Sequence, residues 1–419
     1  TMKMSVNSSI ILFFVFLFSL TNHSIRAQEN EDVFVISGIV KSQKNKRPLE
    51  YVNVSVPGSN VGTITNSDGA FTLKVKKSLH AHLIEISHIG YETATIHINQ
   101  KDVDDRVIYI TPNTVVLNEV VVKPVDARKI VEQALERIPE NYNDKPAMYT
   151  GFYRETSQKR KKYISICEAV INVYKSAYTE DISKDRVKVF KGRRLLSPHE
   201  GDTLAIKLLG GPTQAIFIDM VKNPDVLLSK DCLMYYNYTF NDYVNIDNRP
   251  HYAIRFEPRM MLDEPLYQGT LYIDRETQAI TRMEFALDMR DKIKATSLIL
   301  RSKPVGLRFK PENLSYLVTY RQMGGRTYLN YVRTEIKFKC DWKRKLFSTG
   351  YTVISEMVMT DRIDNAASTI TYRESFKANQ VLSEKVLNFY DENFWESYNI
   401  IEPTESLENA VNKLKKSYK

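Results

Sequence analysis

The sequence has few cysteines and no metal-binding pattern of cysteine and histidine. Only Cys167, Cys232 and Cys340 occur in 419 residues, and no C-x-x-C pair is present. This scarcity excludes a small disulfide-stabilised domain and argues against structural zinc. Cys167 and Cys340 lie in strand-like runs, where a buried free thiol is common, so we expect free thiols, with one disulfide as the alternative.

Long hydrophobic runs are absent beyond the first 27 residues. The one marked run before that point, Ile10–Leu20, follows Lys3 and precedes polar residues and Ala27. As a helix it would cover roughly half of a bilayer core, too little for a typical membrane span. Residues 1–27 are therefore typical of a secretory signal peptide cleaved after Ala27, with an uncleaved anchor as the alternative. We expect an exported protein of the periplasm or the outer-membrane periphery.

The motifs of common enzymes are missing as well. The chain has no G-x-S-x-G, S-x-x-K or H-E-x-x-H motif and no phosphate-binding P-loop. His80 and His82 form an H-x-H pair without a carboxylate cluster, and His199 lacks a visible catalytic partner. The formal charge of +9 is a mild surplus for this length. We expect no enzyme, no metal or other cofactor and no nucleic-acid partner; a hydrolase built from scattered residues is the alternative.

Residues 34–123 consist of short apolar runs separated by turn residues. Val52 and Val54 alternate with polar neighbours, and Asp68-Gly69 has the composition of a hairpin turn. About seven such runs in roughly 90 residues, without a helical period, predict a small sandwich of two β-sheets.

Ordered motifs in this region point to a known module. They are Gly38-Ile39-Val40, Pro48-Leu49 with Val52-Asn53-Val54, Gly62-Thr63 with Thr65-Asn66, Asp68-Gly69-Ala70-Phe71, Ile86-Ser87-His88-Ile89-Gly90-Tyr91 and Leu117-Asn118-Glu119-Val120-Val121-Val122. In these motifs the region resembles the carboxypeptidase-regulatory-like domain of many exported Bacteroidetes proteins. The resemblance implies a transthyretin-like, seven-stranded sandwich with an accessory role and no peptidase activity. A similar module precedes the plug of TonB-dependent transporters, so an accessory role in TonB-dependent nutrient uptake is an alternative function.

A second domain is expected over residues 126–400. Asp126 can cap a helix whose apolar residues recur every three or four positions up to Pro139. Long alternating runs follow, which predict an α+β domain with a large antiparallel sheet and then a charged tail at residues 401–419. Strands are expected at Met148–Thr156, Tyr163–Tyr174, Arg186–Phe190, Leu233–Phe240, His251–Phe256, Gln268–Asp274, Ala279–Leu287, Thr296–Leu300, Leu314–Arg321, Tyr328–Cys340 and Tyr351–Met359, and further helices at Asp202–Val221 and Leu382–Tyr398.

The run Leu271–Phe285 has the pattern of a hairpin followed by alternation. It resembles the hairpin of the curved half-barrel in periplasmic lipoprotein carriers and in uncharacterised Bacteroidetes envelope proteins. That resemblance implies an apolar cavity on one face of the sheet. Flexible methionine beside aromatic residues suits such a pocket, although the same residues also fill ordinary cores. The candidate ligand or partner surface consists of Met283, Phe285, Leu287, Tyr351, Val353, Met357 and Met359.

Four consecutive basic residues, Lys159, Arg160, Lys161 and Lys162, lie between two expected strands. They fit a solvated hairpin tip, or a contact with lipid phosphates or acidic glycans. Together these features favour a non-catalytic protein of the cell envelope. Its expected partner is an envelope protein or an apolar or polymeric ligand, with a possible association with the outer membrane.

Overall fold

The computed structural model describes residues 32–101, 103–113, 126–199, 202, 204, 206–342, 348–388 and 394–416. The expected signal peptide at residues 1–27 and the motif at 117–122 lie outside these residues. No helix of the described chain is long and apolar enough to cross a membrane.

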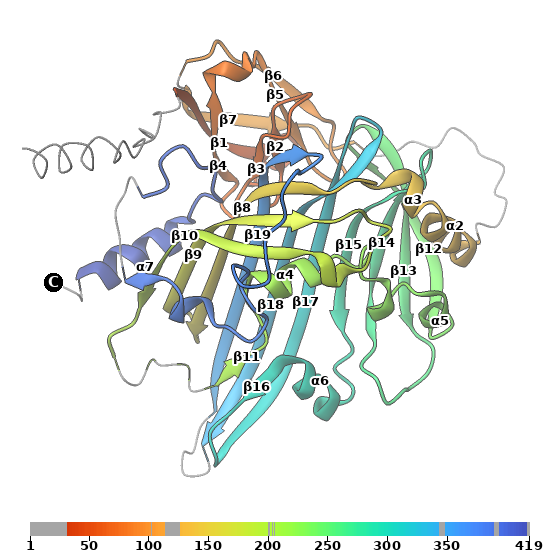
Figure 1. Cartoon of the computed structure of the whole chain (residues 1–419), viewed down its shortest axis with the longest axis vertical. Helices are drawn as coiled ribbons and strands as arrows, with labels where there is room; N and C mark the ends of the chain where they lie inside the picture. The colour runs from red at the N-terminus through yellow and green to blue at the C-terminus, as the bar shows by residue number, and fades with distance from the viewer. Residues whose placement is uncertain are drawn as a thin grey trace, which may run out of the picture. The chain divides into compact units, whose positions relative to one another are not determined.

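The N-terminal region is a sandwich of a three-stranded sheet in the order β4-β1-β7 and a four-stranded sheet in the order β3-β2-β5-β6 (Figure 1). Residues such as Val54, Leu73 and Ile84 are fully buried between the sheets because they occupy alternate positions of their strands. The predicted seven-stranded sandwich is therefore confirmed. Its strands are β1 (Val33–Ser42), β2 (Asn53–Ser55), β3 (Gly62–Ile64), β4 (Ala70–Lys76), β5 (Leu83–Ser87), β6 (Ala94–His97) and β7 (Val103–Ile110), with a 3₁₀ turn, η1, at Lys77–Leu79.

The second region is built on one eleven-stranded sheet, in the order β12-β13-β14-β15-β17-β18-β19-β8-β9-β10-β20. All neighbouring strands are antiparallel except the short pair β10 and β20, as predicted for a large antiparallel sheet. The strands are β8 (Ala147–Lys159), β9 (Lys162–Lys175), β10 (Arg186–Leu196), β12 (Tyr236–Ile246), β13 (Arg249–Pro258), β14 (Tyr267–Asp274), β15 (Ile280–Leu287), β17 (Leu307–Met323), β18 (Arg326–Trp342), β19 (Thr349–Asp364) and β20 (Leu387–Asn388).

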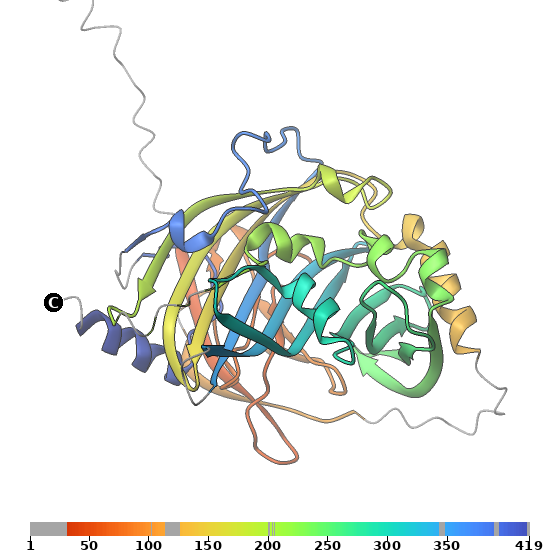
Figure 2. The ribbon, with the colours of Figure 1, turned by 90° about the horizontal axis from the view of Figure 1, so that it is seen from below.

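Short segments cover one face of this sheet, which curves around them (Figures 1 and 2). The larger hydrophobic core lies between that concave face and the covering segments. The sandwich side of the sheet is the opposite, convex face, where Ile64 of β3 packs with Phe152 and Val358. The short elements are β11 (Lys207–Leu208), β16 (Leu300–Ser302), α3 (Ile138–Asn141), α4 (Pro212–Phe217), α5 (Lys230–Leu233), α6 (Lys292–Ile299), η2 (Ile182–Lys184), η4 (Pro224–Val226) and η5 (Leu382–Glu384).

The helix predicted after Asp126 is confirmed as α2 (Ala127–Glu136). The Asp126 carboxylate accepts a hydrogen bond from the backbone N–H of Lys129 and so caps the helix. The three cysteines are free, and Cys167 and Cys340 are buried, as expected.

Three predicted elements are wrong. Among the described residues of Asp202–Val221, the α-helix is confined to α4, because the sequence Gly210-Gly211-Pro212 interrupts any longer one, and Lys207–Leu208 pairs with β16 instead. The described part of Leu382–Tyr398 contains a 3₁₀ turn at Leu382–Glu384 and a short strand at Leu387–Asn388 in place of a helix. Thr296–Leu300 is largely helical, because Asp291 caps α6 through the N–H groups of Ile293 and Lys294. The terminal helix is instead α7 (Glu405–Lys416), inside the predicted charged tail.

Candidate ligand cavity

A cavity of about 620 Å³ lies between the concave face of the large sheet and the segments that cover it. Its floor is formed by β8, β9, β17, β18 and β19, and its cover by the region of β11, α4, α6 and η5. Most lining side chains are apolar, because they occupy the inward positions of alternating strands or the inner sides of the short covering elements. They include Ile164, Ile206, Leu208, Ala215, Ile218, Leu298, Ile299, Leu314, Tyr316, Ile336 and Val353.

A polar strip crosses the floor of this cavity. Glu155 of β8 lies opposite Ser355 of β19, and Ser157 lies opposite Ser165 of β9. The Tyr153 hydroxyl donates a hydrogen bond to Oε2 of Glu155 over 3.0 Å. The strip places hydrogen-bonding groups beside the apolar walls of the cavity.

Glu155 is enclosed by the cover as well as by the floor. The backbone N–H of Gly211 donates to its carboxylate, and burial raises the pKa of this carboxyl above its ordinary value. Gly211 has a φ of 90°, a conformation that favours glycine, and the Gly210–Gly211 turn brings the backbone close to the carboxylate.

Two ion-paired carboxylates line other parts of the cavity. Asp202 accepts a hydrogen bond from Ser197 over 2.7 Å and pairs with Lys162 over 2.5 Å and with Lys159 over 3.5 Å. These contacts lower the pKa of Asp202 to about 2, and the hydrogen bond with Lys162 makes the largest contribution. Glu384 lies 3.3 Å from Lys207, and both of these side chains are largely exposed. Asp202 and Glu384 are therefore already neutralised by cations of the chain.

The predicted ligand surface is divided between the cavity lining and the core beside it. Val353 lines the cavity. Phe285 is buried and stacks on Tyr316, a lining residue, with 4.9 Å between ring centroids. Tyr351 stacks on Phe338 at 5.4 Å. Met283, Leu287, Met357 and Met359 are buried in the same core on the concave side.

The basic cluster lies at the tip of the β8–β9 hairpin, where Lys159 pairs with Lys162 in the strand register. Arg160 has a φ of 58° in the turn, and its backbone N–H donates to the carbonyl of Gly350. Because Lys159 and Lys162 both contact Asp202, two of the four cations already have an internal partner.

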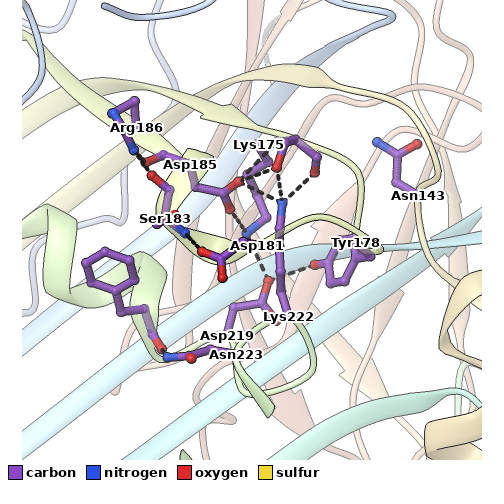
Figure 3. A network of polar contacts seen from close by, with 12 residues as sticks. Asn143, Lys175, Tyr178, Asp181, Ser183, Asp185, Arg186, Asp219, Lys222 and Asn223 are labelled. Carbon is purple, nitrogen blue, oxygen red and sulfur yellow. Dashed lines mark hydrogen bonds and ion pairs between the residues drawn. The ribbon is translucent and has the colours of Figure 1, made fainter. Parts of the chain in front are cut away.

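A second polar cluster lies fully buried beside the cavity cover (Figure 3). Lys175 at the end of β9 contacts Asp185 and Asp219, each over 2.9 Å, and Lys222 contacts Asp185 over 2.7 Å. Tyr320 of β17 donates to Asp219 over 2.7 Å. Two cations thus balance two carboxylates, and the cluster fixes the segment after α4 against the sheet.

Sequence reasoning missed both Glu155 and this buried cluster. For Glu155 a signal was present, because Tyr149, Tyr153 and Glu155 occupy alternate positions of one strand, and a carboxylate on an inward face is unusual. The buried cluster joins residues far apart in the chain and leaves no such signal. In the part of the chain that the structure describes, no three His, Cys, Asp or Glu residues are grouped to hold a metal ion.

Comparisons with known proteins recognise one part of the chain. Similar solved structures include a DUF1329 family protein from Desulfovibrio piger, with 9% identity over 58% of this chain and 96% of that one and a TM-score of 0.26. A LolA superfamily protein from Nitrosomonas europaea has 11% identity over 57% of this chain and 94% of its own, with a TM-score of 0.18. Lipovitellin has 9% identity over 61% of this chain and 29% of its own, with a TM-score of 0.28. These TM-scores are too low to carry an argument about fold or function. No curated protein matches the sequence. Residues 36–122 match the model of the CarboxypepD_reg-like domain, so the resemblance seen in the sequence is confirmed for this part of the chain.

Proposed function

We propose that this chain is a non-catalytic binding protein of the cell envelope that holds an apolar ligand, such as an acyl chain, in the cavity of its large sheet. The observation that carries the proposal is the cavity of about 620 Å³ with predominantly apolar walls on the concave face. Small-molecule sites typically occupy about 300–1,000 Å³ and combine apolar walls with a few polar groups. The cavity has both properties.

The energetics of chain burial support an acyl ligand. Each buried methylene group contributes about 0.8 kcal/mol, so a chain of about ten carbons would gain about 8 kcal/mol. Loss of translational and conformational freedom opposes this gain. The net affinity expected for a simple chain is therefore micromolar or weaker, which suits reversible carriage.

The composition of the lining supports binding rather than catalysis. Several serines line the cavity, among them Ser165 and Ser355, but no histidine is among its described lining residues. A serine nucleophile needs a neighbouring base. Glu155 accepts hydrogen bonds from Tyr153 and from the Gly211 backbone, and no hydrogen bond of the described chain joins it to a serine of the lining.

Placement in the envelope rests on residues 1–27, whose short apolar run and following Ala27 are typical of a signal peptide. Expression in a Gram-negative host followed by intact-mass measurement tests it. The mature protein should begin at Gln28; retention of residues 1–27 in the inner membrane would contradict export.

The binding proposal is tested with the neutral fluorescent probe N-phenyl-1-naphthylamine and its displacement by fatty alcohols. Val353→Trp places a large ring in the cavity and should weaken probe binding about tenfold or more. The matched control is Thr352→Trp, one residue earlier on the same strand and therefore on the opposite face. Equal probe binding by both variants, with both folded, would contradict a ligand site in this cavity.

A further inference from the structure

Glu155 differs from every other carboxylate that lines the cavity. Asp202 and Glu384 are paired with lysines of the chain. Glu155 accepts hydrogen bonds from two neutral donors, the Tyr153 hydroxyl and the Gly211 N–H, and forms no ion pair within the described part of the chain. Among the described residues, the lining therefore has a carboxylate that no lysine or arginine pairs with.

An isolated carboxylate in such surroundings is costly. Glu155 is half-buried beside the apolar walls of the cavity, and moving an unpaired charge from water towards apolar surroundings is unfavourable. Two neutral donors offset part of this cost. A bound cation would offset the rest, because the Coulomb attraction between opposite charges is stronger away from water.

The surroundings of Glu155 fit the head of an amphiphile. Ser355 lies directly opposite on β19, and Ser157 follows on the same face of β8, so hydroxyl acceptors flank the carboxylate. The apolar walls formed by residues such as Ile336 and Val353 begin beside this strip. Charge and shape together favour a molecule with one cationic end and one alkyl chain.

We propose that the cavity selects a cationic amphiphile, binding the primary ammonium of its head at Glu155 and the alkyl chain along the apolar wall. This inference rests on the proposed function, since it requires that the cavity hold an alkyl chain. A neutral alcohol would leave the Glu155 charge unbalanced, and a fatty carboxylate would add a second negative charge beside it.

The test compares dodecylamine, dodecanol and dodecanoate, three ligands with the same chain length, by calorimetric titration of the full mature chain. The titration is performed at mildly alkaline pH and below micelle-forming concentrations. The wild type should bind the alkylammonium about tenfold or more tightly than the alcohol, the size of one charge-assisted hydrogen bond, and should bind the carboxylate most weakly.

Two variants locate the effect. Glu155→Gln keeps the size of the side chain and its contact with Tyr153. It should reduce the ratio of the affinities for dodecylamine and dodecanol to about one. Glu284→Gln removes a carboxylate of β15 that pairs with Arg282 outside the cavity, and should keep the preference.

The outcomes separate the two proposals. Equal binding of the three ligands by the wild type, or a preference that survives in Glu155→Gln, would overturn the role of Glu155 while leaving the acyl cavity intact. Failure of all three ligands to bind would overturn the acyl cavity itself. If Glu155→Gln does not fold, the order of the three ligands on the wild type still decides the matter.

Discussion

Lys175 and Lys222 are buried beside one another, which is tolerated only because two aspartates and several hydroxyl groups surround them. Burial lowers the pKa of Lys222 to about 8, and Lys175 reinforces this shift. The pKa of Lys175 is raised instead, because Asp185 and Asp219 outweigh its burial. The cluster is therefore balanced as a unit, and its members depend on one another.

Removal of one member should be strongly destabilising. Lys175→Met leaves Asp185 and Asp219 with Lys222 as the one remaining buried lysine, so we expect a loss of about 3–5 kcal/mol in the free energy of unfolding, measured by urea denaturation. The matched control is Lys188→Met, which breaks an exposed pair with Glu374 and should cost less than about 1 kcal/mol. A similar small loss in both variants would show that the buried cluster contributes no stability.

We expect His88 to make the stability of the protein depend on pH in the mildly acidic range. Its Nδ1 is buried without a hydrogen-bond partner, and burial lowers its pKa from 6.5 to about 4. The unfolded chain therefore binds a proton in this window that the folded chain does not, so stability falls as the pH drops from 6.5 towards 4, by about 2 kcal/mol for this residue.

Denaturation of a substituted chain across this pH range measures the effect. His88→Gln should lose less stability on acidification than the wild type, whereas His82→Gln, a change at an exposed position, should follow the wild type. An unchanged acid dependence in His88→Gln would contradict this assignment.

At the scale of elements, the long strands could be predicted and the covering segments could not. In β18, Val332, Ile336 and Phe338 are buried on the concave side, as their period of two indicates. The cover consists of elements of a few residues, such as β11 and α4, whose form depends on the surface they meet. Short segments are governed by tertiary contacts more than by propensity, and this is why three of the predictions failed.

Helix α7 also depends on the surface against which it packs. Leu407, Val411 and Leu414 recur at helical spacing and pack with Ile166 and Leu195 on the convex side of β9 and β10. The abundant lysines of this segment lie on its other face and gave it the character of a charged tail.

Val411→Asp should release α7 from the sheet. An unpaired charge at this buried position is expected to cost about 2–4 kcal/mol, and amide hydrogen exchange of residues 405–416 should become fast. Asn412→Asp, at the exposed neighbouring position, should leave exchange slow. Slow exchange in Val411→Asp would mean that the apolar stripe does not hold the helix.

At the scale of the whole described chain, the C-terminal segment before α7 binds both the sandwich and the large sheet. Thr63 and Asn66 of the sandwich donate hydrogen bonds to the carbonyls of Ile400 and Glu402, over 2.9 and 3.1 Å. From the sheet, Arg154 donates to the carbonyl of Ile401 over 2.8 Å. Residues of the module's own sequence motifs thus hold a segment more than 300 positions away.

The sandwich should nevertheless fold as a separate fragment. Its core is made by its own seven strands, so residues 28–124 expressed alone should give a β-rich domain with a cooperative melt. Ile64, buried against the large sheet in the full chain, would be more exposed, so we expect the fragment to be less stable than the full chain. Circular dichroism on heating measures both properties. An unfolded fragment would show that the boundary is misplaced or that the sandwich requires the second region.

The sandwich, the long antiparallel sheet and helix α2 follow from the amino-acid sequence alone, because local periodicity and capping encode them. The other features depend on contacts between segments that are far apart in the chain. On β18, Arg333 lies on the face opposite to the buried Val332 and Ile336, and there the ring of Tyr51 lies 5.6 Å from its guanidinium. The cavity depends in the same way on which short segments meet the concave face, and the position of Glu155 within it depends on the turn at Gly211. Such contacts join distant positions, and no local pattern in the chain specifies them.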